Sequence, residues 1–233
     1  MTKCEKKSAM SIANIVEGFH CISETSPKTG LSDYSYFLIC DSGNLLFHPL
    51  KKTAELKKCS RLFDENGGIR LQLLTHDAEA SSSCDWIHER YGAGLYFNAA
   101  DTPHLVRKSA CPIANSFSAA HRISDALEAI PLTGHTFGFT PYRLVHPEGV
   151  FLFIGDFLVP KGGVWVANVY KLLMPVGIEN LKLLKEIESD FLFPNKSKGL
   201  LQPPFKLVGS SRDTAIDHAI EVAGEKAAVT RPS

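Results

Sequence analysis

The sequence lacks an excess of either charge sign, because its 25 Lys and Arg residues equal its 25 Asp and Glu residues. Nucleic acids and anionic membranes select basic proteins, so we expect neither as a main partner. The sequence also lacks an apolar run near the ~18 residues that span a bilayer. Its first seven residues carry lysines with no apolar stretch behind them, so we expect no secretory signal.

Cysteine pairs of the C-x-x-C type are missing too, since the six cysteines are scattered along the chain. Several lie in apolar runs, as Cys40 does after Phe-Leu-Ile, where a free thiol packs as a small core residue. A chain of this length can bury a core that needs no disulfide framework. These features indicate a reduced, cytoplasmic protein.

The composition is otherwise ordinary, with 44% hydrophobic and 21% charged residues. That balance excludes wholesale disorder, and a length of 233 residues suits a single domain. We expect a flexible N-terminus over residues 1–10, one domain over 11–224 and a flexible tail over 225–233.

Apolar stretches alternate with turn sequences through both halves of the chain. Asp41-Ser42-Gly43-Asn44 predicts a hairpin turn, and so does Pro147-Glu148-Gly149. Apolar residues recur every three or four positions over 179–187 and 213–223, which predicts helices there. The expected strands span 15–22, 34–40, 45–47, 69–74, 95–97, 127–132, 140–145, 150–154, 191–193 and 205–208. Two β-rich halves, each followed by helices, predict two packed sheets with helices outside.

Three loops that follow apolar strands carry side chains of the types that bind metal ions. The first contains Thr75-His76-Asp77-Ala78-Glu79, the second Gly134-His135-Thr136-Phe137-Gly138, and the third Gly155-Asp156. The end of a strand presents such side chains from a fixed backbone. These loops are therefore the candidate site.

The order and spacing of Thr75-His76, Gly134-His135-Thr136-x-Gly138 and Phe153-Ile154-Gly155-Asp156 resemble those of the metallo-β-lactamase superfamily. The resemblance runs from about Ile15 to Lys198. It implies an α/β fold of four layers, the αββα sandwich, with two mixed β-sheets and helices on the outer faces. The superfamily includes glyoxalase II-type hydrolases, lactonases, β-lactamases and persulfide dioxygenases.

The chain departs from the T-H-x-H-x-D-H motif that supplies ligands to two metal ions in this family. Thr75 and His76 match, but the later ligand positions hold Ala78, Ala80 and Ser81. Alanine cannot coordinate a metal, and serine is a poor ligand for zinc. A binuclear hydrolase is therefore not expected.

Two other family positions have changed as well. No histidine lies within 193–197, where the resemblance places a late ligand. Lys196 stands there instead, and its ammonium is a candidate substitute for the charge of the second metal. The strand that ends in aspartate in the family ends here at His48, a candidate compensating ligand. Glu79, beside the missing second histidine, is another.

The resemblance leaves one metal position with most of its ligands, namely His76, His135 and Asp156. Two imidazoles and one carboxylate form a set known for catalytic zinc and for non-heme iron(II). We expect at most one metal ion here, zinc in preference to iron. His135 and Asp156 are the expected catalytic residues.

Three functions remain open on the sequence alone. The first is a hydrolase that uses metal-activated water on an ester, thioester or lactone. The second is a metal-free pseudoenzyme that binds a ligand or a protein. The third is a mononuclear iron oxygenase of the persulfide dioxygenase type, although that branch keeps the full first motif. The apolar segment 159–176 favours a small-molecule ligand with an apolar acyl or aromatic group.

Overall fold

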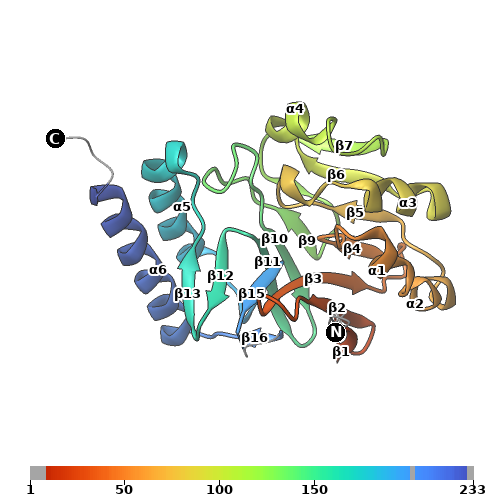
Figure 1. The fold of residues 1–233 in the computed structure, drawn as a ribbon, viewed down its shortest axis with the longest axis horizontal. Coiled ribbons are helices and arrows are strands. Elements are labelled where there is room, and N and C mark those ends of the chain that lie inside the picture. Colours follow the sequence, from red (N-terminus) through yellow and green to blue (C-terminus); the bar gives the residue numbers. More distant parts are fainter. Residues whose placement is uncertain (1–8, 200–202, 230–233) are drawn as a thin grey trace, which may run out of the picture.

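Two β-sheets lie face to face in the computed structural model, which describes residues 9–199 and 203–229 (Figure 1). The first sheet has the order β13-β12-β15-β3-β4-β5-β6-β7. Strand β2 also pairs with β3, and β1 pairs with β2. Its strands are β1 (Ala9–Val16), β2 (Phe19–Thr25), β3 (Leu31–Leu38), β4 (Leu45–Phe47), β5 (Leu71–Leu73), β6 (Gly94–Asn98), β7 (Ile113–Phe117), β12 (Leu158–Lys161), β13 (Val164–Ala167) and β15 (Lys196–Lys198).

The second sheet has the order β16-β14-β11-β10-β9-β8. Its strands are β8 (His121–Arg122), β9 (Leu127–Ala129), β10 (Tyr142–His146), β11 (Gly149–Gly155), β14 (Phe191–Pro194) and β16 (Phe205–Lys206). The helices are α1 (Thr53–Lys57), α2 (Ser60–Glu65), α3 (Ser82–Tyr91), α4 (Thr102–Leu105), α5 (Met174–Glu186) and α6 (Ser210–Val229), with short 3-10 turns η1 (Asp77–Glu79), η2 (Ala99–Asp101) and η3 (Lys171–Leu173). Both sheets mix parallel and antiparallel pairs.

Strand β11 shows how alternation builds the layers. Phe151 and Phe153 belong to the core between the sheets, where the Phe153 ring stacks on Phe47 with centroids 3.8 Å apart. Leu152 and Ile154 point the other way and pack with residues of α5 and α6. Successive side chains of a strand face opposite sides, so one strand serves two apolar layers.

The first sheet repeats this arrangement with the opposite helices. Tyr36 and Phe47 face the core between the sheets. Their neighbours Phe37 and Leu46 face outward and pack with Phe63 of α2. Helices therefore cover the outer faces of both sheets, and the predicted αββα sandwich is confirmed.

The expected bounds of one strand and one helix need correction. The stretch 15–22 is not one strand, because it contains the end of β1, the turn at Gly18 with φ +71° and the start of β2. The helix expected over 213–223 is longer, because α6 extends from Ser210 to Val229. Residues 1–8 and 230–233 of the expected flexible ends lie outside the described residues.

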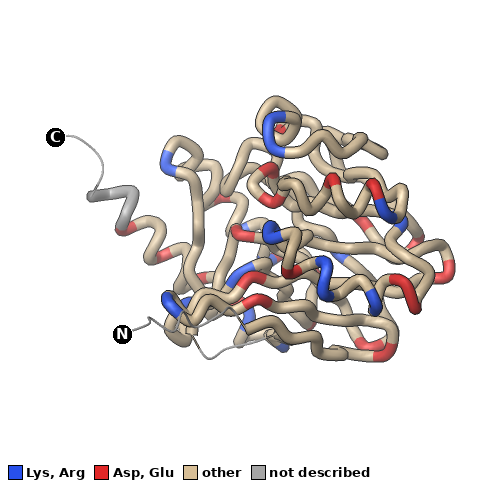
Figure 2. Tube along the Cα trace, turned by 45° about the vertical axis from the view of Figure 1, so that its right-hand side comes forward, with Lys and Arg blue, Asp and Glu red and all other residues tan. Residues whose placement is uncertain are grey.

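Lys and Arg positions are interspersed with Asp and Glu positions over the molecule (Figure 2). Within residues 9–199 and 203–229, no helix is long and apolar enough to cross a membrane.

The segment 159–176 contains the β12–β13 hairpin, which turns at Gly162 and Gly163, both with positive φ.

Candidate metal centre

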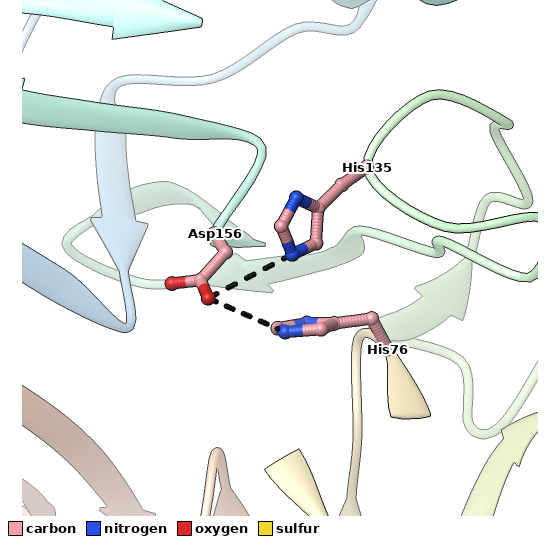
Figure 3. Close-up of side chains that lie close together, drawn as sticks. All are labelled: His76, His135 and Asp156. Atoms are coloured by element: carbon pink, nitrogen blue, oxygen red, sulfur yellow. Dashed lines mark ion pairs between the residues drawn. The ribbon is translucent and has the colours of Figure 1, made fainter. Parts of the chain in front are cut away.

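Three loops bring His76, His135 and Asp156 together, as Figure 3 shows. His76 follows the buried strand β5, and Asp156 follows β11. His135 lies in the connection between β9 and β10. One nitrogen or oxygen atom of each side chain lies within 4.8 Å of the others. The residues that the sequence motifs single out thus converge at one point.

The distances from the two histidines to Asp156 are longer than those of ordinary hydrogen bonds. His76 Nε2 lies 3.4 Å from Asp156 Oδ2, and His135 Nε2 lies 3.7 Å from the same oxygen. Hydrogen bonds between such atoms are about 2.7–3.2 Å long. Ligand atoms about 2.0–2.2 Å from a tetrahedral ion are roughly 3.3–3.6 Å from each other. The 3.4 Å distance lies in this range and the 3.7 Å distance just above it, so the spacing is close to that of ligands around one ion.

Two buried polar atoms of the cluster have no hydrogen-bond partner, His76 Nε2 and Asp156 Oδ1. Burying such atoms unpaired is costly. The donor set, the spacing and these unpaired atoms all fit a bound cation. His76, His135 and Asp156 are the residues that could hold it.

The remaining ring nitrogens are held by the protein. His135 Nδ1 lies 2.8 Å from the carbonyl oxygen of Asn168, which can only accept, so Nδ1 carries the proton. His76 Nδ1 lies 3.0 Å from Thr75 Oγ1 and 3.2 Å from Glu79 Oε1. Each imidazole therefore turns its Nε2 toward the centre, and in the neutral ring this atom carries the lone pair, as in metal-bound histidines.

Glu79 lies behind His76 and not among the converging atoms. Its Oε1 accepts from Thr75 Oγ1 at 2.7 Å and from Asn195 Nδ2 at 2.8 Å, and His48 Nδ1 lies 2.7 Å away. Its Oε2 accepts from the Thr75 backbone N–H at 2.8 Å. Both candidate replacement ligands, Glu79 and His48, thus lie outside the three-residue cluster, where Glu79 holds His76 and His48 holds Glu79.

Lys196 reaches the cluster from β15, and its Nζ donates to Asp156 Oδ2 at 2.6 Å. Its ammonium therefore lies beside the cluster, and its role as a substitute for the charge of a second metal ion stays a prediction. Sequence reasoning missed Asn195 and Asn168, because it searched for ligand types and these residues act through an amide and a backbone carbonyl.

The buried charges shift one another's pKa. Burial opposes the charged form of His76, but the carboxylates of Glu79 and Asp156 outweigh it and raise the pKa of His76 to about 9. Burial and the charge of His76 lower the pKa of His135 to about 4. Burial opposes the ionised carboxylates, yet His48 and His76 hold the pKa of Glu79 well below its usual range, and His76 and Lys196 do the same for Asp156.

These shifts predict an alkaline loss of stability in the metal-free protein. The raised pKa of His76 stabilises the fold fully below the unfolded value of 6.5, and this contribution declines as the pH rises toward about 9. At roughly 1.4 kcal/mol per pH unit, the free energy of unfolding should fall by about 2–3 kcal/mol between pH ~6.5 and ~8.5.

Urea unfolding of chelator-treated protein across this interval measures the effect. The range stops at about pH 8.5, where the thiols of the unfolded chain begin to ionise. Above it the buried cysteines add their own loss of stability, because burial raises the pKa of Cys59 to about 11 and that of Cys84 to about 12. The variant His76→Gln should show a flat profile. A wild-type profile as flat as that of the variant would contradict the assignment of a charged His76.

Structural comparison relates the fold of the chain to known proteins. The metallo-β-lactamase FIM-1 from Pseudomonas aeruginosa in its mono-zinc form has a TM-score of 0.71 and 12% identity, covering 95% of this chain and 98% of that one. The metallo-β-lactamase DIM-1 has a TM-score of 0.69 and 14% identity, covering 94% and 100%. A metallo-β-lactamase from Erythrobacter litoralis has a TM-score of 0.68 and 11% identity, covering 97% and 99%.

No family model matches the sequence, and no curated protein matches it either. The structural likeness extends over nearly the full length of both chains, while the sequence identity is low. The chain therefore has the metallo-β-lactamase fold.

Proposed function

We propose that this protein is a hydrolase with a single metal ion, held by His76, His135 and Asp156 and supported by Lys196. The observation that carries the proposal is the convergence of two Nε2 atoms on Asp156 Oδ2, at 3.4 and 3.7 Å, while both Nδ1 atoms are engaged elsewhere. Zinc is the preferred ion because imidazole and carboxylate suit it. When bound, zinc supplies Lewis acidity and lowers the pKa of a coordinated water toward ~7.

The residues of the chain contribute orientation and charge. Glu79 and Asn168 hold the two imidazole rings, so little reorganisation accompanies a reaction. Lys196 and Asp156 both line a cavity of about 350 Å³ next to the cluster. The Lys196 ammonium therefore faces a bound substrate and can stabilise negative charge that develops on a carbonyl oxygen.

The substrate class follows from this cavity. Leu31, Val159 and Val166 give it an apolar wall. An ester, thioester or lactone with an apolar acyl or aromatic portion would bury that portion here, which supports the small-molecule substrate expected from the sequence.

A metal-free binding protein is the second candidate, and one observation favours it. With His76 protonated, the positive charges of His76 and Lys196 balance the negative charges of Glu79 and Asp156 without any ion. Metal binding requires His76 to release its proton, so the two states exclude each other.

Metal analysis of protein purified without chelator separates the candidates. About one equivalent of zinc, together with hydrolysis within a panel of aryl esters, thioesters and lactones, supports the hydrolase. Iron with oxygen uptake would indicate the oxygenase instead. Absence of metal, with no rise in melting temperature on adding zinc, manganese or iron, would overturn the proposal. A saturating metal at about a thousandfold excess over Kd should stabilise the fold by ~4 kcal/mol.

A further inference from the structure

A second cavity, of about 280 Å³, borders the cluster at His135. It shares no lining residue with the cavity of about 350 Å³ that Asp156 and Lys196 line. The proposed hydrolysis places its substrate in that larger cavity and assigns no ligand to the smaller one. A volume near 300 Å³ is at the lower end of the range for small-molecule sites, so a small ligand fits here.

The mouth of the second cavity is apolar and exposed to solvent. Phe137, Tyr170 and Leu172 line it, and their exposed fractions are 60%, 52% and 76%. Phe137 belongs to the loop of His135, and the Tyr170 backbone N–H donates to the carbonyl oxygen of Gly134 in that loop at 2.9 Å. This bond holds the two segments together, so the apolar residues flank the cavity before any ligand binds.

The buried part of the same cavity carries a carboxylate. Asp101 lines it and is 3% exposed. Its side chain accepts from the backbone N–H groups of Asp77 and Gly138, at 3.0 and 2.9 Å, and from the Thr136 hydroxyl at 2.8 Å. All three donors are neutral, so they stabilise the ionised form without cancelling its charge.

No lysine or arginine lines this cavity, and Asp101 forms no ion pair with any side chain that the structure describes. Asp77, the other acid of the lining, is paired with Lys108 at 2.6 Å. The charge of Asp101 is therefore the one that lacks a counter-charge, and burying a charge in this way is costly. Burial accordingly raises the pKa of Asp101, and a cation close by would favour its ionised form.

We propose that the second cavity binds a small organic cation, an ammonium group on an aromatic or aliphatic body, with its charge toward Asp101 and its body against Phe137, Tyr170 and Leu172. The uncompensated carboxylate attracts the positive charge. The exposed apolar side chains gain from being covered, and the rings of Phe137 and Tyr170 favour a cation as well. This site goes beyond the proposed hydrolysis and requires neither a metal ion nor turnover.

Isothermal titration of the full chain with three matched probes tests the site. Phenethylammonium carries the charge, phenethyl alcohol is its neutral analogue, and hydrocinnamate reverses the charge. The ammonium should bind about tenfold more tightly than the alcohol, because a partly buried charge pair is added, and hydrocinnamate should bind most weakly. The preference should persist after treatment with a chelator. Equal affinity for the ammonium and the alcohol would overturn the site. So would a preference that chelation abolishes, since the amine would then bind a metal ion.

Variants at the mouth and in the buried part locate the bound probe. Leu172→Ala should weaken binding of both the ammonium and the alcohol about fivefold, because apolar cover is lost. Its matched control is Leu183→Ala, at an exposed leucine of α5 outside the cavity, which should bind both as the wild type does. Wild-type affinity in Leu172→Ala, or an equal loss in the control, would contradict the assignment.

Asp101→Asn should bind the ammonium and the alcohol equally, because the charge is gone. A folded Asp101→Asn protein that keeps the tenfold preference would overturn the role of this carboxylate. Asp101 also joins two loops through its hydrogen bonds, so urea unfolding verifies that the variant folds. If it does not fold, the probe comparison in the wild type and the pair Leu172→Ala and Leu183→Ala decide the question.

The outcomes also separate this inference from the proposed function. A preference for the cation in protein that holds no metal and hydrolyses nothing leaves this site standing and refutes the hydrolase. Zinc-dependent hydrolysis, together with equal affinity for the three probes, does the reverse.

Discussion

The variant His135→Ala should lose bound metal almost completely, from about one equivalent to a small residue after dialysis. Binding free energies of about 10–16 kcal/mol at structural zinc sites are shared among the ligands, so one ligand of three or four contributes roughly 3 kcal/mol or more. His135 is the ligand chosen for substitution because its side chain is 15% exposed and its removal leaves no buried charge behind. The metal-dependent rise in melting temperature should vanish with the metal.

The control for this experiment is His218→Ala, an exposed histidine on α6, far from the cluster in the sequence. It should bind metal as the wild type does. Because the pKa of His135 is lowered, it is neutral at pH 7, so its loss should not disturb the charge balance of the metal-free protein. A His135→Ala protein that retains the wild-type metal content would refute the ligand assignment directly.

The variant Glu79→Ala should destabilise the protein by about 3–5 kcal/mol, the usual cost of removing one partner from a buried charge network. Glu79 is 2% exposed and accepts from Thr75 and Asn195. Its removal leaves these donors and the imidazoles of His48 and His76 without their acceptor. Urea unfolding measures the loss, and Glu186→Ala, an exposed acid on α5, should change stability by less than about 0.5 kcal/mol.

Glu79→Gln separates packing from charge. The amide keeps the shape but turns an NH₂ group toward donors, so we expect a smaller loss of stability than in the alanine variant. The negative charge that chiefly raises the pKa of His76 is gone, so the alkaline loss of stability should become weaker. Metal affinity should fall by about 10–100-fold, as for other residues that orient ligands. An unchanged pH profile in this variant would show that Glu79 does not control His76.

The loop Thr75–Glu79 shows where sequence reasoning reached its limit. The position of Glu79 near the missing histidine made it a candidate ligand. The 3-10 turn η1 instead folds its carboxylate back onto the Thr75 N–H, four residues earlier in the chain. Only the turn geometry decides whether a side chain at this spacing points toward the centre or behind it.

Lys196 was singled out because it stands in the segment where the resemblance places a late ligand, and its side chain pairs with Asp156. The resemblance located a late ligand in the segment after β14, and β15 pairs with β3 and so holds that segment beside Asp156. That this ammonium replaces the charge of a second metal ion stays a prediction.

What the sequence by itself determined is the architecture and the identity of three convergent side chains, because alternating apolar residues, turn signals and motif spacing are properties of short segments. Which nitrogen of each imidazole faces the centre was decided only by the tertiary structure. That choice depends on contacts such as Asn168 with His135 and Asn195 with Glu79, the latter across 116 positions of sequence. Hydrogen bonds at such separations form only after the sheets have packed, so no local pattern encodes them.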